Sequence, residues 1–188
     1  TGDHNWYCAA TLTAPDVIHT AKHCVDPYGA SAPYAVRFRR ALDGSVGTIE
    51  AGVASFYHAL IASWDFPGGV VGDDVAIGHL VEPVPHIAPI PVLYEDPAPE
   101  VYITAPLIVA GWGREGPGPG EGPLTRLRTC DTWIDGIGKF QITFPTAWDP
   151  WRNACGPNSN DSGGAALVWR GGSQLLHVGI ISGLGAAV

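Results

Sequence analysis

Apolar residues recur along this chain in short runs that end at glycine, proline or other turn-forming residues. Two segments, 36–39 and 139–144, alternate between apolar and polar residues, which is typical of a strand with one solvated face. No stretch has the sustained 3.6-residue period of an amphipathic helix. The pattern therefore predicts an all-β protein of many short strands, arranged as a sandwich or barrel. Expected strands include 8–13, 17–20, 35–39, 46–58, 75–81, 101–110, 140–144, 165–170 and 175–182.

Composition narrows the class of protein further. The 188 residues suit one domain, or two small halves that share a core. A formal net charge of −8, with only 10 lysines and arginines, argues against nucleic acid as a partner. There is no run of about 18 apolar residues, so we expect no transmembrane helix and no membrane partner. The first residues carry no basic or apolar leader, so we expect any signal peptide to have been removed.

Three separated segments carry the residue types of a hydrolytic site. They are Thr20-Ala21-Lys22-His23-Cys24, Asp74-Val75-Ala76-Ile77-Gly78-His79-Leu80 and Asn160-Asp161-Ser162-Gly163-Gly164. A serine hydroxyl is a poor nucleophile unless a neighbouring base, most often histidine, takes its proton. A carboxylate then holds the imidazole in the correct tautomer. We therefore expect Ser162 as the nucleophile, His23 as general base and acid, and Asp74 as the orienting carboxylate.

The order of these segments, with Gly111-Trp112-Gly113 between the second and the third, resembles that of trypsin/chymotrypsin-like serine proteases, in a bacterial-type variant with short termini. Asp74, rather than Asp73, matches the family's aspartate motif. The resemblance implies an all-β fold of two packed antiparallel six-stranded β-barrels, chymotrypsin-like, with the active site at their interface. We expect an N-terminal half at 1–95 and a C-terminal half at 96–188, joined by a proline-rich connector.

The resemblance also implies how substrate is bound. The backbone N–H groups of Asn160 and Ser162 are expected to form the oxyanion hole. The expected substrate-binding residues are Asn153, Ala154, Ser182, Gly183 and Leu184. The first two lie near the base of the specificity pocket, and neither is acidic, which disfavours cleavage after lysine or arginine. Leu184, near the pocket mouth, favours small or medium apolar side chains at the P1 position of the substrate.

The four cysteines allow three disulfide pairings. The family resemblance implies a bridge between Cys8 and Cys24 beside His23, which leaves Cys130 and Cys155 for each other. Disulfides persist in oxidising compartments, so we expect a secreted, extracellular protein. Free buried thiols in a cytosolic protein are the alternative interpretation.

The chain departs from the family's pattern in two respects, the partner of Asp161 and the residue at 160. Asp161 is expected to form a buried structural ion pair, because a buried carboxylate needs a partner. The chain lacks the Ile- or Val-Val-Gly-Gly amino terminus that supplies the ammonium in trypsin-like zymogens. Either the first strand has been lost or an arginine replaces the ammonium, and our hypothesis is that Arg114 or Arg152 does so. Asn160 stands where the family has glycine, and asparagine tolerates left-handed dihedrals, so the oxyanion hole is expected to survive in weakened form.

The sequence thus predicts a secreted serine endopeptidase that works through an acyl-enzyme, without a cofactor and without a metal. A polypeptide substrate and a protein inhibitor are its expected partners, and we expect a monomer. His19 and His23 have a spacing that can bind zinc on a helix, but on a strand it does not converge. The alternative is a non-catalytic, protease-like binding module, which Lys22 and Asn160 favour. An α/β-hydrolase esterase would need Gly-x-Ser-x-Gly and the order Ser, Asp, His, and the chain has neither.

Overall fold

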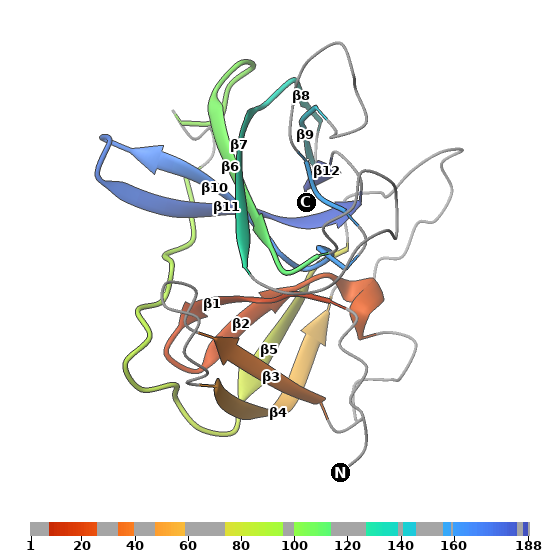
Figure 1. Ribbon diagram of the computed structural model, residues 1–188, viewed down its shortest axis with the longest axis vertical. Helices are drawn as coiled ribbons and strands as arrows, with labels where there is room; N and C mark the ends of the chain where they lie inside the picture. The colour runs from red at the N-terminus through yellow and green to blue at the C-terminus, as the bar shows by residue number, and fades with distance from the viewer. Residues whose placement is uncertain are drawn as a thin grey trace.

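The structure consists of two antiparallel β-sheets, which lie one above the other in Figure 1. It is a computed structural model that describes residues 8–25, 34–39, 48–58, 74–95, 100–113, 127–138, 141–145, 156–158, 160–183 and 186–187. Within these ranges the only helix is a single 3-10 turn, η1 (Lys22–Cys24). No helix of the described residues is long and apolar enough to span a membrane. The all-β prediction is confirmed.

The first sheet has five strands in the order β1-β2-β5-β4-β3. Their bounds are β1 (Thr11–Ala14), β2 (Val17–Thr20), β3 (Tyr34–Arg39), β4 (Thr48–His58) and β5 (Ala76–Leu80). Along β2 the side chains alternate, so that Ile18 and Thr20 are buried while Val17 and His19 are partly exposed. Leu12, Ile18, Leu80 and Val84 form the core of this half.

The second sheet has seven strands in the order β7-β6-β10-β11-β12-β9-β8. Their bounds are β6 (Pro106–Gly111), β7 (Arg128–Trp133), β8 (Gly136–Ile137), β9 (Ile142–Thr143), β10 (Ala165–Arg170), β11 (Gln174–Gly183) and β12 (Ala186–Ala187). The long hairpin of β10 and β11 lies between β6 and β12 in the sheet, and its far end projects beyond the other strands (Figure 1). Its buried residues pack with those of β6, and Leu107, Ile134, Val168 and Ile181 are each at most 2% exposed.

The described strands number five and seven, where six in each half were expected. Closure of each sheet into a barrel and the division at 95/96 stay predictions. One expected strand, 101–110, was wrong in its first half, because the chain turns at Tyr102 and Thr104 before β6 begins. Ala105 N–H donates to Tyr102 O at 2.9 Å, and Thr104 has a φ of 72°, which a strand cannot contain.

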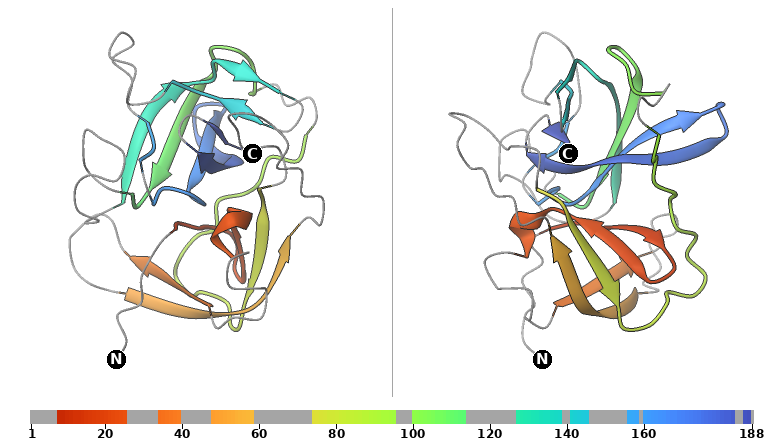
Figure 2. Two further views of the ribbon diagram at one scale, coloured as in Figure 1. Left: turned by 90° about the vertical axis from the view of Figure 1, so that its right-hand side faces the viewer. Right: turned by 180° about the vertical axis from the view of Figure 1, so that it is seen from behind.

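The described part of the proline-rich connector, residues 83–95, runs along the side of the molecule from the first sheet to the second (Figure 2). Ile90 N–H donates to Leu12 O of β1 at 2.9 Å, which ties the connector to the first sheet. Further along, Leu93 N–H donates to His177 O and His177 N–H donates to Pro91 O, both at 2.9 Å, on β11 of the second sheet. The connector therefore contributes backbone hydrogen bonds that hold both sheets in place.

Candidate active site

His23 and Asp74 come together because their strands are neighbours. β2 pairs antiparallel with β5, with Thr20 opposite Ala76, so the residues that leave β2 lie next to those that enter β5. The chain then turns into η1, where His23 N–H donates to Asp74 Oδ1 at 2.8 Å. The imidazole Nδ1 lies 2.6 Å from Asp74 Oδ2. One oxygen of the Asp74 carboxylate therefore bonds the backbone of His23, and the other bonds its ring.

The Asp74 carboxylate also joins the two sheets. Ser182, on β11, donates its hydroxyl hydrogen bond to Asp74 Oδ2. Burial of the carboxyl tends to raise its pKa, but the hydrogen bonds from His23 and Ser182 outweigh burial and lower the pKa below its ordinary value. Asp74 is therefore ionised at neutral pH, and the imidazole hydrogen sits on Nδ1, which leaves Nε2 as the basic nitrogen.

Ser162 lies in a tight turn just before β10, and the turn is packed against the first sheet. Ala9 N–H donates to Ser162 O at 2.7 Å, while Thr20 Oγ1 donates to Ala9 O at 2.8 Å. A Cβ on Gly163 would lie 2.1 Å from Ala9 O, and Gly163 has a φ of 84°, so both space and conformation require glycine. Ser162 precedes β10 of the second sheet and His23 follows β2 of the first sheet, and both residues are partly buried at this junction.

No hydrogen bond joins the Ser162 hydroxyl to the His23 imidazole, although the structure describes both residues. In enzymes without substrate, catalytic hydrogen bonds are often long and shorten in the complex. The structure thus assembles the His–Asp couple and fixes the serine turn by other contacts.

Asp161, next to Ser162, is 7% exposed. Its Oδ1 accepts from Gly113 N–H at 2.5 Å and its Oδ2 accepts from Asn158 N–H at 2.7 Å. Burial raises the pKa of this carboxyl, and the two backbone donors oppose the rise. Arg114 and Arg152, the hypothesised partners, lie outside the described residues.

Asn160 has a φ of 74°, which is the left-handed conformation expected for this position. The role of its N–H as an oxyanion donor stays a prediction. Ser182 and Gly183 end β11, whereas the other expected substrate-binding residues, Asn153, Ala154 and Leu184, lie outside the described residues.

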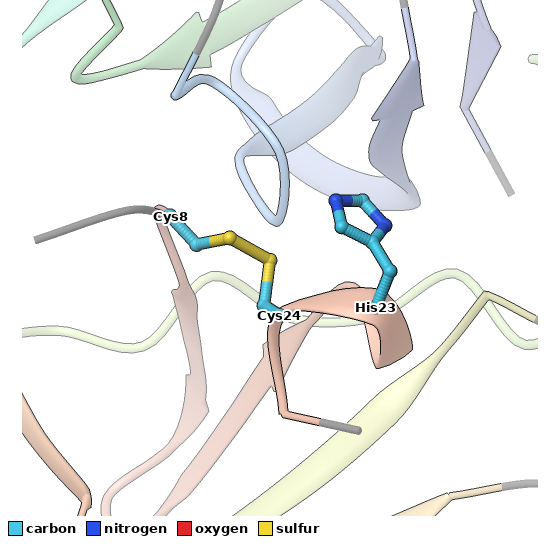
Figure 3. A group of neighbouring side chains, drawn as sticks. All are labelled: Cys8, His23 and Cys24. Atoms are coloured by element: carbon cyan, nitrogen blue, oxygen red, sulfur yellow. A yellow bond between two sulfur atoms is a disulfide. The ribbon is translucent and has the colours of Figure 1, made fainter. Parts of the chain in front are cut away.

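The predicted Cys8–Cys24 disulfide is present and lies beside His23 (Figure 3). Possible ligand atoms of Cys8, His23 and Cys24 lie within 4.8 Å of one another. The two sulfur atoms are bonded to each other, so they are not the thiolates that zinc would require. Cys130 is also disulfide-bonded, and Cys155, its expected partner, lies outside the described residues.

Sequence reasoning missed the contact of Thr20 with Ala9, which braces the serine turn. The signal was present, because Thr20 immediately precedes the histidine motif and is a polar residue at the buried end of a strand. It also missed His177, a buried residue whose ring meets that of His19 where β11 faces β2. An isolated histidine in a strand carries no sequence signal of its own.

Comparison with known families agrees with this geometry. The trypsin family model matches residues 1–187, which is nearly the whole chain and includes every segment of the candidate site. No curated protein matches the chain significantly. On the extent of the family match, the chain belongs to the trypsin family, and it is therefore a serine protease in general type.

Proposed function

We propose that this chain is a serine endopeptidase in which Ser162, His23 and Asp74 act as the catalytic triad. The observation that carries the proposal is the Asp74 carboxylate, held by the backbone and ring of His23 and by Ser182. A partly buried, ionised carboxylate on Nδ1 is what a general-base histidine needs to present Nε2 to a nucleophile. The non-catalytic binding module is not favoured, because it gives no reason for this arrangement.

The reaction proceeds through an acyl-enzyme. His23 Nε2 takes the proton of Ser162 Oγ as this oxygen attacks the substrate carbonyl. The carbonyl oxygen becomes an oxyanion, which accepts hydrogen bonds from the N–H groups of Asn160 and Ser162, each worth about 10²–10³-fold in rate. His23 then gives the proton to the leaving amine. Water, activated by the same imidazole, hydrolyses the ester and restores Ser162.

The substrate is a polypeptide chain. The pairing of β11 with β10 ends at Ile180, and the end of β11 at Ser182 and Gly183 binds the substrate backbone by β-addition. Because Asn153 and Ala154 are not acidic, specificity for lysine or arginine is disfavoured, and small or medium apolar P1 residues are preferred. The Cys8–Cys24 disulfide and the family match support secretion. We also propose that the enzyme is a monomer and that a protein inhibitor can block it.

A fluorophosphonate probe tests the proposal. Ser162 Oγ would attack phosphorus, fluoride would leave, and the hydroxyl proton would pass to His23. We expect one adduct by intact mass on the wild type and none on Ser162→Ala. Ser173→Ala is the matched control, because Ser173 is exposed in the turn between β10 and β11, and it should label like the wild type.

Circular dichroism of all three proteins would show that each is folded. A folded wild type that stays unlabelled would contradict the proposal and would favour the non-catalytic binding module instead.

A further inference from the structure

Asp161 places a charged carboxylate in the serine turn. It is buried, and it immediately precedes Ser162 in the chain. A buried carboxylate without a nearby cation takes up a proton rather than remain ionised. A protonated carboxyl would be a weaker acceptor for the N–H groups of Gly113 and Asn158 that now bind it.

Gly111, the last residue of β6, and Gly113, two residues later, show on which face of the sheet the Asp161 carboxylate lies. A Cβ on Gly111 would lie 2.1 Å from Asp161 Oδ1, and a Cβ on Gly113 would lie 2.4 Å from Asp161 Oδ2. The direction in which a Gly111 side chain would point is therefore occupied by the Asp161 carboxylate. Any side chain larger than hydrogen at these two positions would displace it.

Strand register brings a cation to the same face. In the antiparallel pair β6–β7, Gly111 is opposite Arg128. Directly opposed residues point their side chains to the same face of a sheet, so Arg128 leaves β7 on the face where Asp161 lies. Its Nη2 donates to Gly113 O at 2.8 Å, and Gly113 N–H in turn donates to Asp161 Oδ1 at 2.5 Å.

We propose that Arg128 is the cation that keeps Asp161 ionised and so positions the turn that carries Ser162. Within the part of the chain that the structure describes, Arg128 is the one charged side chain whose field acts on this carboxyl, and it acts to lower its pKa. Gly113 connects the two groups through its carbonyl and its N–H. Arg128 thus takes the place hypothesised for Arg114 or Arg152.

Arg128 is a positioning residue, because it acts on Ser162 only through Asp161. This role rests on the proposed function, since it is the nucleophile's turn that is positioned. The energetic coupling of Arg128 to Asp161, on which this role depends, can be measured in a protein without catalytic activity. The two ideas can therefore fail separately.

The first test is a double-mutant cycle in the inactive Ser162→Ala background, with Arg128→Gln and Asp161→Asn alone and combined. We expect Arg128→Gln to raise the unfolding equilibrium constant at pH 7 about tenfold when Asp161 is present, and much less when it is asparagine. An equal effect in both backgrounds would overturn the proposal, whatever the activity of the wild type. If Asp161→Asn does not fold, the Asp161 carboxyl is titrated by carbon-13 NMR in Ser162→Ala and in Ser162→Ala/Arg128→Gln. We expect a higher pKa of Asp161 in the protein without Arg128, and an unchanged pKa would overturn the proposal.

The second test is the pH profile of fluorophosphonate labelling in the active protein. Arg128→Gln should label about tenfold more slowly near pH 6. Its labelling rate should recover as the pH rises, because at higher pH Asp161 ionises even without its cation. Arg128→Lys should restore part of the rate. Arg170→Gln removes the same charge from a surface pair with Glu95 and Glu100, and should change nothing. A uniform loss at all pH values in Arg128→Gln, or the same loss in Arg114→Ala, would overturn the assignment.

Discussion

Replacing His177 by leucine should flatten the dependence of folding stability on pH between pH 7 and pH 5. His177 lies on β11, is 2% exposed, and meets His19 of β2 with ring centroids 5.4 Å apart. Its Nε2 has no hydrogen-bond partner within the described part of the chain. Burial first, and then the nearby His19, lower the pKa of His177 from its ordinary 6.5 to about 3.

The sign of the effect follows from this lowered pKa. Below pH 6.5 the unfolded chain binds a proton at His177, whereas the folded protein does not until the pH approaches 3. The stability that neutral His177 provides is therefore complete above pH 6.5 and is lost as the pH falls. The loss between pH 7 and pH 5 is about 2 kcal/mol. Carboxyl groups contribute equally to the pH dependence of stability in the protein with His177 and in the variant without it, so their contribution cancels in the comparison.

Urea denaturation measures this difference directly, with tryptophan fluorescence as the signal. Ser162→Ala and Ser162→Ala/His177→Leu are compared at pH 7 and at pH 5, because the inactive background prevents autolysis. Between pH 7 and pH 5, we expect the free energy of unfolding to fall by about 2 kcal/mol more in the protein that retains His177 than in the double variant. His79→Leu, which changes an exposed histidine on β5, should behave as the background does.

Equal losses in the two proteins, within about 0.5 kcal/mol, would refute the reasoning, because His177 would then have the same pKa in the folded and unfolded states. Proton NMR of the His177 ring gives an independent answer. A folded-state pKa near 6.5 would refute it as well.

Two further substitutions test the geometry of the site. Gly163→Ala should cost about 3 kcal/mol or more in urea denaturation, because the new Cβ would meet Ala9 O at 2.1 Å in addition to the strain of a positive φ. Gly171→Ala, at a φ of 59° with nothing within 4 Å of its Cβ, should cost only about 1–2 kcal/mol, and equal costs would contradict the proposed contact. Ser182→Ala should raise the pKa of Asp74 by removing a hydrogen bond, and should slow fluorophosphonate labelling about 3- to 10-fold. An unchanged labelling rate would show that Ser182 does not support the His–Asp couple.

The sequence was a good guide where a pattern is local. β2, β5, β10 and β11 fall within one or two residues of the expected strands, because each has a run of apolar or β-branched residues bounded by turns. β7 was missed, because Arg-Thr-Cys-Asp-Thr-Trp has little apolar alternation and only Thr132 in it is buried. The turn before β6 was hidden in a continuous apolar stretch.

The sequence by itself determined the family of this protein: three segments with a serine, a histidine and a carboxylate occur in the order that resembles the trypsin family, and the family match agrees. Only the tertiary structure decided how Asp74 is held, because Ser182, which binds it, is 108 residues away in the chain. The same is true of Arg128, which the register of β6 and β7 places on the face that carries Asp161. Contacts of this kind depend on strand register and sheet packing, which bring together residues that no local propensity links.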